Sequence, residues 1–337
     1  MSQSLSLKID IFCHILPEKY KKALDEAAPG HIQQDTNNLL PTLWDLDHRF
    51  RIMDRYGVMQ VLTLSRPPIE EVISDPKKAL DLTKRANDEM AEIVLKYPDR
   101  FPAAVAAVAL TDVDASLKEL ERAINDLRFR GVQIYTNMNG KPLNSPEFEP
   151  LFEMMARYNL PIWIHPTHGI TANDYSSETG SKYAVASTFG WPYETTMAMN
   201  RLVFGGILGR YPTLKVITHH CGGMLPFYEE RARAFHDRGE LIRSDKDKIG
   251  LTKAPIDYYK MIYADTAIYG NTLGLMLGRA FFGIDHLLFG TDFPFAGQYG
   301  ERVTRQTIAA IEKMDISDSE KKKIFEDNAR ALMRLPV

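Results

Sequence analysis

Short apolar runs bounded by turn residues alternate along this chain with longer stretches in which apolar residues recur at helical spacing. The short runs are typical of buried strands, and the longer stretches are typical of helices that pack on one face. The runs that predict strands are Leu7–Cys13, Val58–Leu64, Pro102–Leu110, Gly131–Tyr135, Pro161–His165, Leu214–His219, Met261–Asp265 and His286–Thr291. The stretches that predict helices are Asp47–Tyr56, Pro76–Tyr97, Val113–Phe129, Pro146–Tyr158, Pro192–Tyr211, Leu225–Arg238, Asn271–Phe282 and Glu301–Lys313, with Asp318–Leu332 as a closing helix.

Eight repeats of strand followed by helix predict an α/β fold of the (β/α)8 TIM-barrel type. A doubly wound sheet is the alternative, but it needs a glycine-rich turn after the first strand, and the sequence has none there. No Pro- or Ser-rich linker divides the chain, so we expect residues 1–337 to form a single domain.

Three connections are longer than a barrel loop usually is. Leu16–Trp44 and Pro166–Gly190 follow strands one and five, so they are expected on the catalytic face, where they would wall in a substrate. The third, Arg238–Asp257, follows a helix and carries mixed charges, which indicates a surface excursion or a subunit contact.

The composition is that of an ordinary globular protein, with 45% hydrophobic and 25% charged residues. The net charge of −3 gives no general attraction to nucleic acid or to an anionic membrane. No stretch reaches the roughly 20 apolar residues of a membrane helix, and Met1–Leu7 lacks the basic start of a signal peptide. The two cysteines, Cys13 and Cys221, form no CxxC pair, so a reducing compartment is expected, by default the cytoplasm.

Four polar side chains stand at or directly after the ends of strand-predicting runs: His14, His165, His220 and Asp292. In a barrel the carboxyl ends of the strands meet at one face, where the active site lies. Imidazole and carboxylate groups gathered there are suitable ligands for zinc and similar divalent ions. The four residues therefore predict a metal-dependent active site.

Phe12 stands two residues before His14, where a partner ligand is expected. Because side chains alternate along a strand, Asp10, Phe12 and His14 share one face and Cys13 faces the helices. Phenylalanine cannot bind a metal, which leaves three protein ligands and water. Asp10 is the only nearby replacement, and it lies deeper in the strand.

His220 lies in the segment Thr-His-His-Cys-Gly-Gly, whose glycines allow a tight turn close to a ligand. His219 and His220 are neighbours, so we expect them to point to opposite faces and only one of them to enter the site.

Taken in order, several segments resemble the amidohydrolase superfamily, and within it the decarboxylase branch. That branch includes aminocarboxymuconate-semialdehyde decarboxylase and the γ-resorcylate and hydroxybenzoate decarboxylases. The resemblance covers nearly the whole chain, and the segments that carry it are Ile9–Pro17, Arg49–Gln60, Trp163–Thr167, Glu194–Pro212, His220–Gly223 with Pro226, Phe289–Pro294 and Asn328–Arg330.

The resemblance implies a role for each matching residue. His14, His165 and Asp292 would bind one divalent metal ion, zinc or manganese, with occupancy in question because of Phe12. His220 would be the catalytic histidine, and Asp292, partly protonated beside the metal, would donate the proton. Arg49 would contact the substrate carboxylate, with Arg51 as the second choice.

Five aromatic side chains could line a flat pocket: Phe12, Trp44, Trp191, Phe293 and Phe295. Ordinary core packing explains them equally well. Phe12 and Phe293, which flank the expected metal ligands, are the ones we expect to touch the substrate.

The predicted activity is metal-dependent, non-oxidative removal of the carboxyl group of a small aromatic or unsaturated acid, such as a hydroxybenzoate. One alternative is a metal-dependent hydrolase or hydratase on the same scaffold, acting on a lactone, an amide or an enol acid. Another is a metal-depleted barrel that serves as a binding protein, which Phe12 alone favours. The resemblance also implies a homodimer or homotetramer that binds a small-molecule carboxylate. The net charge and the lack of a long apolar run argue against nucleic acid and membrane as partners.

Overall fold

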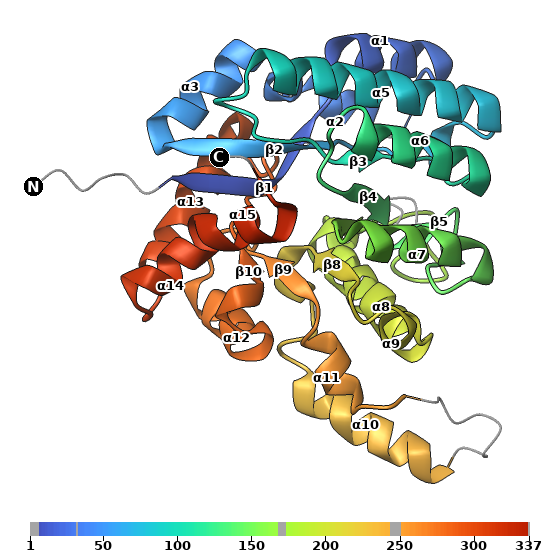
Figure 1. Cartoon of the computed structure of the whole chain (residues 1–337), viewed down its shortest axis with the longest axis vertical. Coiled ribbons are helices and arrows are strands. Elements are labelled where there is room, and N and C mark those ends of the chain that lie inside the picture. The colour runs from blue at the N-terminus through green and yellow to red at the C-terminus, as the bar shows by residue number, and fades with distance from the viewer. Residues whose placement is uncertain (1–6, 32, 168–172, 243–250, 336–337) are drawn as a thin grey trace, which may run out of the picture.

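The structure is a computed structural model that describes residues 7–31, 33–167, 173–242 and 251–335 (Figure 1). Its strands are β1 (Lys8–Ile15), β2 (Val58–Leu64), β3 (Ala106–Ala107), β4 (Val132–Tyr135), β5 (Asn137–Met138), β6 (Lys141–Pro142), β7 (Pro161–His165), β8 (Lys215–Thr218), β9 (Tyr263–Asp265) and β10 (Leu287–Leu288). Its helices are α1 (Glu18–Ala27), α2 (Gln34–Asn38), α3 (Leu46–Tyr56), α4 (Ile69–Val72), α5 (Pro76–Lys96), α6 (Val113–Asn125), α7 (Glu149–Tyr158), α8 (Trp191–Phe204), α9 (Ile207–Arg210), α10 (Glu229–Ile242), α11 (Pro255–Tyr259), α12 (Thr272–Phe282), α13 (Glu301–Glu312), α14 (Asp318–Lys322) and α15 (Asn328–Met333).

The parallel strands close into a barrel. Parallel pairing joins β3, β4, β7, β8, β9 and β10 in that order, and it joins β1 to β2. A bridge between Leu62 and Ala104 connects β2 to the chain just before β3. Beyond β10, Phe289 accepts a hydrogen bond from the amide of Ile11 at 2.9 Å, and Phe293 pairs with Cys13. Within the described residues the strands therefore form the predicted (β/α)8 barrel, with β5 and β6 as a separate antiparallel pair.

Several predicted elements are shorter or broken. The run Pro102–Leu110 forms regular strand only at Ala106–Ala107, and the eighth run only at Leu287–Leu288. The helix predicted over Pro192–Tyr211 is divided into α8 and α9, because Gly206 has a φ of +76°, which ends a right-handed helix. The closing helix is likewise divided, by a π-helical turn at Lys323–Asp327.

The predicted helix starts agree with the capping groups. The Asp112 carboxylate accepts a hydrogen bond from the amide of Ala115 at the start of α6. Ser317 and Glu320 cap each other's backbone amides at the start of α14. These contacts satisfy amides that the helix itself leaves unpaired.

The apolar core has an inner and an outer part. Side chains such as Phe12, Val61, Trp163 and Ile217 fill the barrel interior. A larger cluster lies between the strands and the surrounding helices. In Figure 1 the helices α1, α3, α5 and α6 lie on the side of the barrel formed by β1, β2 and β3, while α10 and α11 extend away from the barrel. The interior packing leaves the carboxyl ends of the strands as the place for polar side chains.

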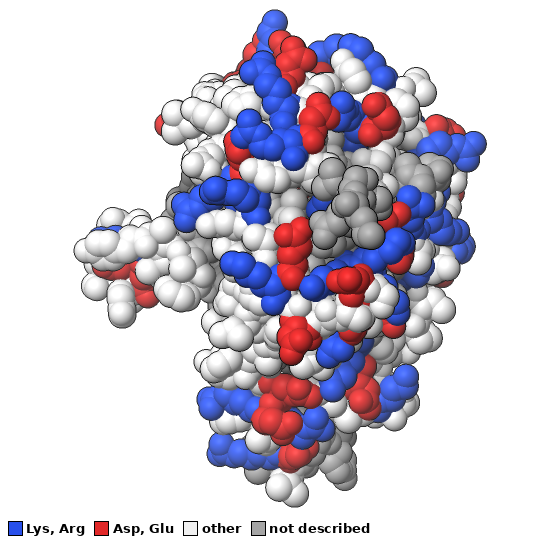
Figure 2. Space-filling model, turned by 90° about the vertical axis from the view of Figure 1, so that its left-hand side faces the viewer, with Lys and Arg blue, Asp and Glu red and all other residues white. Residues whose placement is uncertain are grey.

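The long predicted connections fold in part. The first contains α1 and α2, and the second ends in a π-helical turn at Ala186–Gly190. Residues 168–172 of the second and 243–250 of the third lie outside the described residues. No described helix is long and apolar enough to cross a bilayer. On the face shown in Figure 2, positive and negative side chains alternate, and neither sign covers a continuous area.

Candidate active site at the barrel mouth

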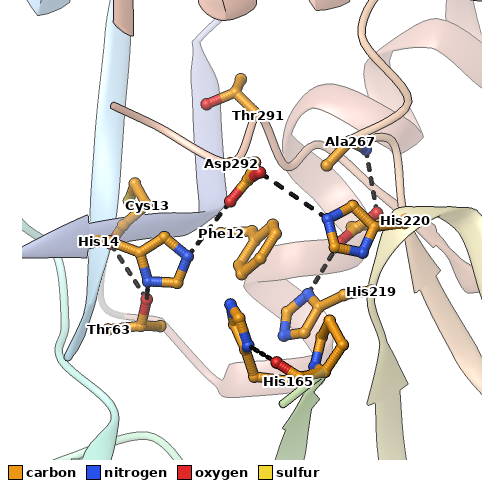
Figure 3. A network of polar contacts seen from close by, with 12 residues as sticks. Phe12, Cys13, His14, Thr63, His165, His219, His220, Ala267, Thr291 and Asp292 are labelled. Atoms are coloured by element: carbon orange, nitrogen blue, oxygen red, sulfur yellow. Dashed lines mark hydrogen bonds and ion pairs between the residues drawn. The ribbon is translucent and has the colours of Figure 1, made fainter. Parts of the chain in front are cut away.

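The carboxyl ends of four barrel strands bring the predicted residues together (Figure 3). Nε2 of His14 lies 3.3 Å from Oδ1 of Asp292, and Nε2 of His220 lies 3.8 Å from Oδ2 of the same carboxylate. The ring centres of His14 and His165 are 5.1 Å apart. All four residues are buried. The structure therefore gathers His14, His165, His220 and Asp292 in one cluster.

The hydrogen bonds of His14 assign its tautomer. The Thr63 hydroxyl donates to the carbonyl of Cys13 at 3.2 Å and lies 3.3 Å from Nδ1 of His14. Because that hydroxyl has a single proton, it accepts from Nδ1–H, and the lone pair of neutral His14 is on Nε2. Nε2 faces the Asp292 carboxylate without a hydrogen bond. A lone pair and a carboxylate oxygen 3.3 Å apart repel each other unless a proton or a metal ion lies between them.

His165 has the same orientation. Its Nδ1–H donates to the carbonyl of Pro166 at 2.7 Å, which leaves the Nε2 lone pair. Burial, and then the neighbouring His14, His219 and Arg66, lower the pKa of His165 well below its usual value. A neutral imidazole with a free Nε2 is the form that binds metal ions.

Asp292 is the centre of the polar network. Besides the two histidines, the hydroxyl of Tyr269 donates to its Oδ2 at 2.6 Å. Burial alone would raise the pKa of Asp292, but the imidazoles of His14 and His220, 3.3 and 3.8 Å away, hold it well below its usual value when they carry a proton. Burial alone would lower the pKa of His220, yet Asp292 outweighs it, and the pKa is raised. These directions favour an ionised Asp292 with the proton of the pair on His220, and a partly protonated Asp292 beside a bound metal stays a prediction.

His219 also reaches the cluster, so the expectation that only one of the two adjacent histidines enters was wrong. The ring of His219 stacks on Phe12, with centres 3.7 Å apart, and lies 5.5 Å from the ring of His165. Strand alternation fails here because β8 ends at Thr218 and His220 has a φ of +53°. That left-handed backbone turns His220 back toward Asp292.

Asp265, at the end of β9, fixes His219. Its Oδ2 accepts from Nδ1 of His219 at 2.8 Å, and its Oδ1 accepts from the amides of Cys221 and Ala267. Asp265 ends a predicted strand, as His165 does, and that position was the signal that could have identified it. Thr63 and Tyr269 carry no comparable signal in the sequence.

Phe12 lies among the histidines as predicted. Its ring centre is 4.8 Å from that of His14 and 5.6 Å from that of His165. Asp10 does not replace the missing ligand, because the hydroxyl and amide of Thr291 and the amide of Phe12 already donate to its two oxygens. Burial raises the pKa of Asp10 to about 7.

Arg49 does not reach the cluster, which corrects the expected carboxylate contact. It is completely buried behind β1, where Nε donates to Gln60 at 2.6 Å and Nη1 donates to the carbonyl of His14 at 2.7 Å. The inner face of α3 packs against the outside of the barrel wall, so a side chain on that face cannot reach the mouth. Arg51, the second choice, is exposed on the same helix.

Phe293 is also on the outer side of the wall, contrary to its expected contact with substrate. It packs with Cys13 and Ile52, and the guanidinium of Arg49 lies 4.8 Å from its ring centre. Phe293 directly follows Asp292, whose left-handed backbone (φ +64°) redirects the chain, and the Phe293 side chain lies in the outer cluster rather than at the mouth. Cys13 accordingly faces the helices, as expected.

Two of the other aromatic candidates do contact the cluster. The ring of Phe295 lies 5.5 Å from that of His14. Trp191 contacts both His165 and His220, at 6.2 and 6.3 Å between ring centres. Trp44 packs instead in the outer core beside Lys21.

The donors suit a divalent cation, although they do not form a finished metal centre. His14 and Asp292 already lie as two ligands of one ion would, and His165 offers a third lone pair. Among the described residues, no three His, Cys, Asp or Glu side chains are close enough to form a metal site as they stand. The Phe12 ring occupies space between the histidines, so binding requires side-chain adjustment.

Known proteins of similar sequence span nearly the same length. The chain is 28% identical to 2-amino-3-carboxymuconate-6-semialdehyde decarboxylase of Dictyostelium discoideum, over 98% of this chain and 92% of that protein. It is 29% identical to γ-resorcylate decarboxylase of Polaromonas sp., over 90% of this chain and 91% of that protein.

A solved structure agrees with the fold. 5-Carboxyvanillate decarboxylase of Novosphingobium aromaticivorans, complexed with manganese and 4-hydroxy-3-methoxy-5-nitrobenzoic acid, superposes with a TM-score of 0.83 at 26% identity, over 99% of this chain and 100% of that one. The family model described as amidohydrolase matches residues 9–335. This chain therefore belongs to the amidohydrolase family.

Proposed function

We propose that this protein is a non-oxidative decarboxylase of a small hydroxylated aromatic or unsaturated acid. The bond between the carboxyl carbon and the ring or alkene carbon breaks, carbon dioxide leaves, and a proton takes its place. The observation that carries the proposal is the buried Asp292 carboxylate held between two imidazoles, 3.3 Å from Nε2 of His14 and 3.8 Å from Nε2 of His220. Each of the similar proteins described above is named for a decarboxylation, which supports the same chemistry.

We propose one divalent ion, zinc or manganese, bound by His14, His165 and Asp292. The manganese in the similar 5-carboxyvanillate decarboxylase supports this choice. When bound, such an ion supplies Lewis acidity toward the oxygens of the substrate. Thr63 and the carbonyl of Pro166 orient the two imidazoles by accepting their Nδ1–H groups.

The protein's own residues would handle the proton. Nε2 of His220 holds it next to Asp292, and Trp191 stacks against the same imidazole. Proton delivery from His220 to the carbon that bears the carboxyl group breaks aromaticity and lets carbon dioxide leave. Asp292 stabilises the charged form of His220 before transfer, and Tyr269 restrains Asp292 by donating to Oδ2. Phe12, between the histidines, limits the shape of acid that the mouth accepts.

Carbon dioxide release tests this proposal. The purified protein, loaded with zinc or with manganese, is incubated in deuterated water with a panel of hydroxybenzoates. We expect carbon dioxide and a product with one deuterium at the vacated carbon. A substrate that is consumed while retaining its carboxyl carbon would favour a hydrolase or hydratase instead. Protein that binds the acids but neither retains metal nor turns them over would be a binding protein.

We further propose that the whole chain acts as one catalytic unit, since the family match spans residues 9–335. Self-association into a dimer or tetramer is supported by large apolar side chains exposed on and before α10, including Phe227, Phe235 and Leu241. Light scattering of the purified protein tests it, and a monomer at working concentration would contradict it. The free, buried thiols of Cys13 and Cys221 favour a reducing compartment, by default the cytoplasm.

A further inference from the structure

A second arginine, Arg66, is buried at the mouth. It follows β2 by two residues and is 6% exposed. The side-chain amide of Asn37 donates to its backbone carbonyl at 3.1 Å, which holds this part of the chain in place. Its guanidinium carbon lies 5.1 Å from the ring centre of Trp191. Arg66 is therefore fixed against an indole that also contacts His165 and His220.

The guanidinium of Arg66 lacks a partner for most of its donors. Nε and Nη1 are buried and make no hydrogen bond, and within the described residues no carboxylate is close enough to form an ion pair with it. The carboxylate whose charge acts on Arg66 is that of Glu71, and its Oε1 already accepts from the hydroxyl of Thr167. Guanidinium has no neutral form at physiological pH, so these donors stay charged and unsatisfied. A buried charge in this state is unfavourable unless a ligand supplies the missing acceptor.

We propose that Arg66 binds a second acidic group of the substrate, so that the preferred substrate is a flat dicarboxylic acid rather than a monocarboxylic one. The inference rests on the proposed decarboxylase function. One carboxylate and its neighbouring oxygen lie at His14, His165 and Asp292, the ring lies beside Trp191, and the second carboxylate accepts from a parallel pair of Arg66 donors, either Nε with Nη2 or Nη1 with Nη2. Two parallel N–H donors match the two oxygens of a carboxylate.

Arg66 is better suited to the acid group that remains than to the one that leaves. Carbon dioxide is neutral, so pairing the departing carboxylate with a fixed guanidinium stabilises the ground state more than the transition state. Pairing with a group that stays ionised throughout affects both states equally and contributes to binding. Arg66 therefore acts as a specificity-determining residue, and its loss is expected in KM rather than in kcat.

The test compares 2-hydroxybenzoate with 4-hydroxybenzene-1,3-dicarboxylate, which differ by one carboxylate. Calorimetric binding and carbon dioxide release are measured on the metal-loaded wild type, Arg66→Met, Arg66→Lys and, as a control, Arg85→Met, which alters an exposed arginine on α5. We expect the wild type to bind the dicarboxylate about 10- to 100-fold more tightly, the size of a charge-assisted bidentate pair. Arg66→Met should remove this preference, Arg66→Lys should keep part of it, and Arg85→Met should keep all of it.

The thermal midpoint of the ligand-free Arg66→Met protein adds an independent measure, because loss of an unpaired buried charge should leave it equal or higher. A dicarboxylate preference that survives in Arg66→Met, or equal binding of both acids by the wild type, overturns the role of Arg66. If Arg66→Met does not fold, Arg66→Lys decides by the same comparison. The two proposals fail separately. Tight, Arg66-dependent binding without carbon dioxide release removes the decarboxylase, and carbon dioxide release from the dicarboxylate with a KM that is the same in the wild type and in Arg66→Met removes the second acid site.

Discussion

The two sides of β1 differ in how completely their buried polar groups are hydrogen-bonded. Behind the strand, Arg49 donates to Gln60 and to the carbonyl of His14, and Phe293 packs against its guanidinium. At the mouth, Nε2 of His14 and Nδ1 of His220 are buried without hydrogen bonds. Groups that have found partners hold the wall together, whereas groups that lack them are available to a metal or a substrate. Burial alone does not separate the two cases.

The largest effect is expected at the mouth. His220→Asn removes the proposed proton donor, and we expect kcat for decarboxylation to fall by about 10²- to 10⁴-fold with little change in thermal stability. Stopped assays of carbon dioxide release and a thermal melt measure both quantities. A variant that retains kcat would show that the proton comes from elsewhere, and Asp292 would then return as the candidate donor.

Behind the barrel wall we expect the opposite result, a large effect on stability and a small effect on catalysis. Arg49→Met leaves Gln60 and the carbonyl of His14 without their donors, so the free energy of unfolding should fall by about 2–4 kcal/mol. Urea denaturation measures the loss, and Arg51→Met, on the exposed side of α3, is the matched control with little change expected. A selective rise in KM, with stability unchanged, would instead place Arg49 in contact with the substrate.

Asp10 tests whether hydrogen-bond partners are sufficient to keep a buried carboxylate ionised inside the barrel. It accepts three hydrogen bonds, yet burial raises its pKa from 3.8 to about 7. The folded protein therefore holds a proton that the unfolded chain loses first, and the stability due to Asp10 is complete below about pH 4 and is lost as the pH rises through 7.

Asp10→Asn copies the protonated acid at every pH. We expect its stability advantage over the wild type to grow between about pH 4 and 7 and then level off, on the order of 2–4 kcal/mol. Urea unfolding across that range measures it. A difference that does not vary with pH would mean that Asp10 stays ionised in the fold.

Phe12 stands at the position where a further protein ligand would complete the metal centre. Phe12→His adds a ligand between His14 and His165, so we expect metal affinity to increase about tenfold or more and the range of accepted acids to change. Competition with a chelator, followed by elemental analysis, measures the affinity. Unchanged affinity would mean that residue 12 does not face the bound ion.

The smallest effect concerns the restraint on Asp292. Tyr269→Phe removes one hydrogen bond of 2.6 Å from a carboxylate that keeps its two histidine neighbours. We expect a loss of about 1 kcal/mol, or several-fold in kcat, with metal content retained. Loss of metal in this variant would show instead that Tyr269 helps to position a ligand.

Local sequence patterns were sufficient to predict which strand ends carry the candidate metal ligands. His14, His165 and Asp292 were predicted at the carboxyl ends of strands, and barrel closure brought them within contact of one another. His219 was excluded by the alternation rule, which ceased to apply where β8 ended and the backbone of His220 became left-handed. Asp265 and Arg66 also lie at or just after strand ends. Nothing in the sequence indicated that Asp265 binds His219, or that the guanidinium of Arg66 lacks hydrogen-bond partners.

The order of apolar runs determined the barrel and the family motifs, because periodicity along a strand or a helix is a local property of the chain. The tertiary structure decided on which side of the wall each side chain lies. Arg49 and Phe293 belong to motifs that imply substrate contact, yet packing places them behind β1. Whether a buried charge meets a partner depends on groups distant in sequence: Nε and Nη1 of Arg49 have acceptors, whereas Nε and Nη1 of Arg66 have none.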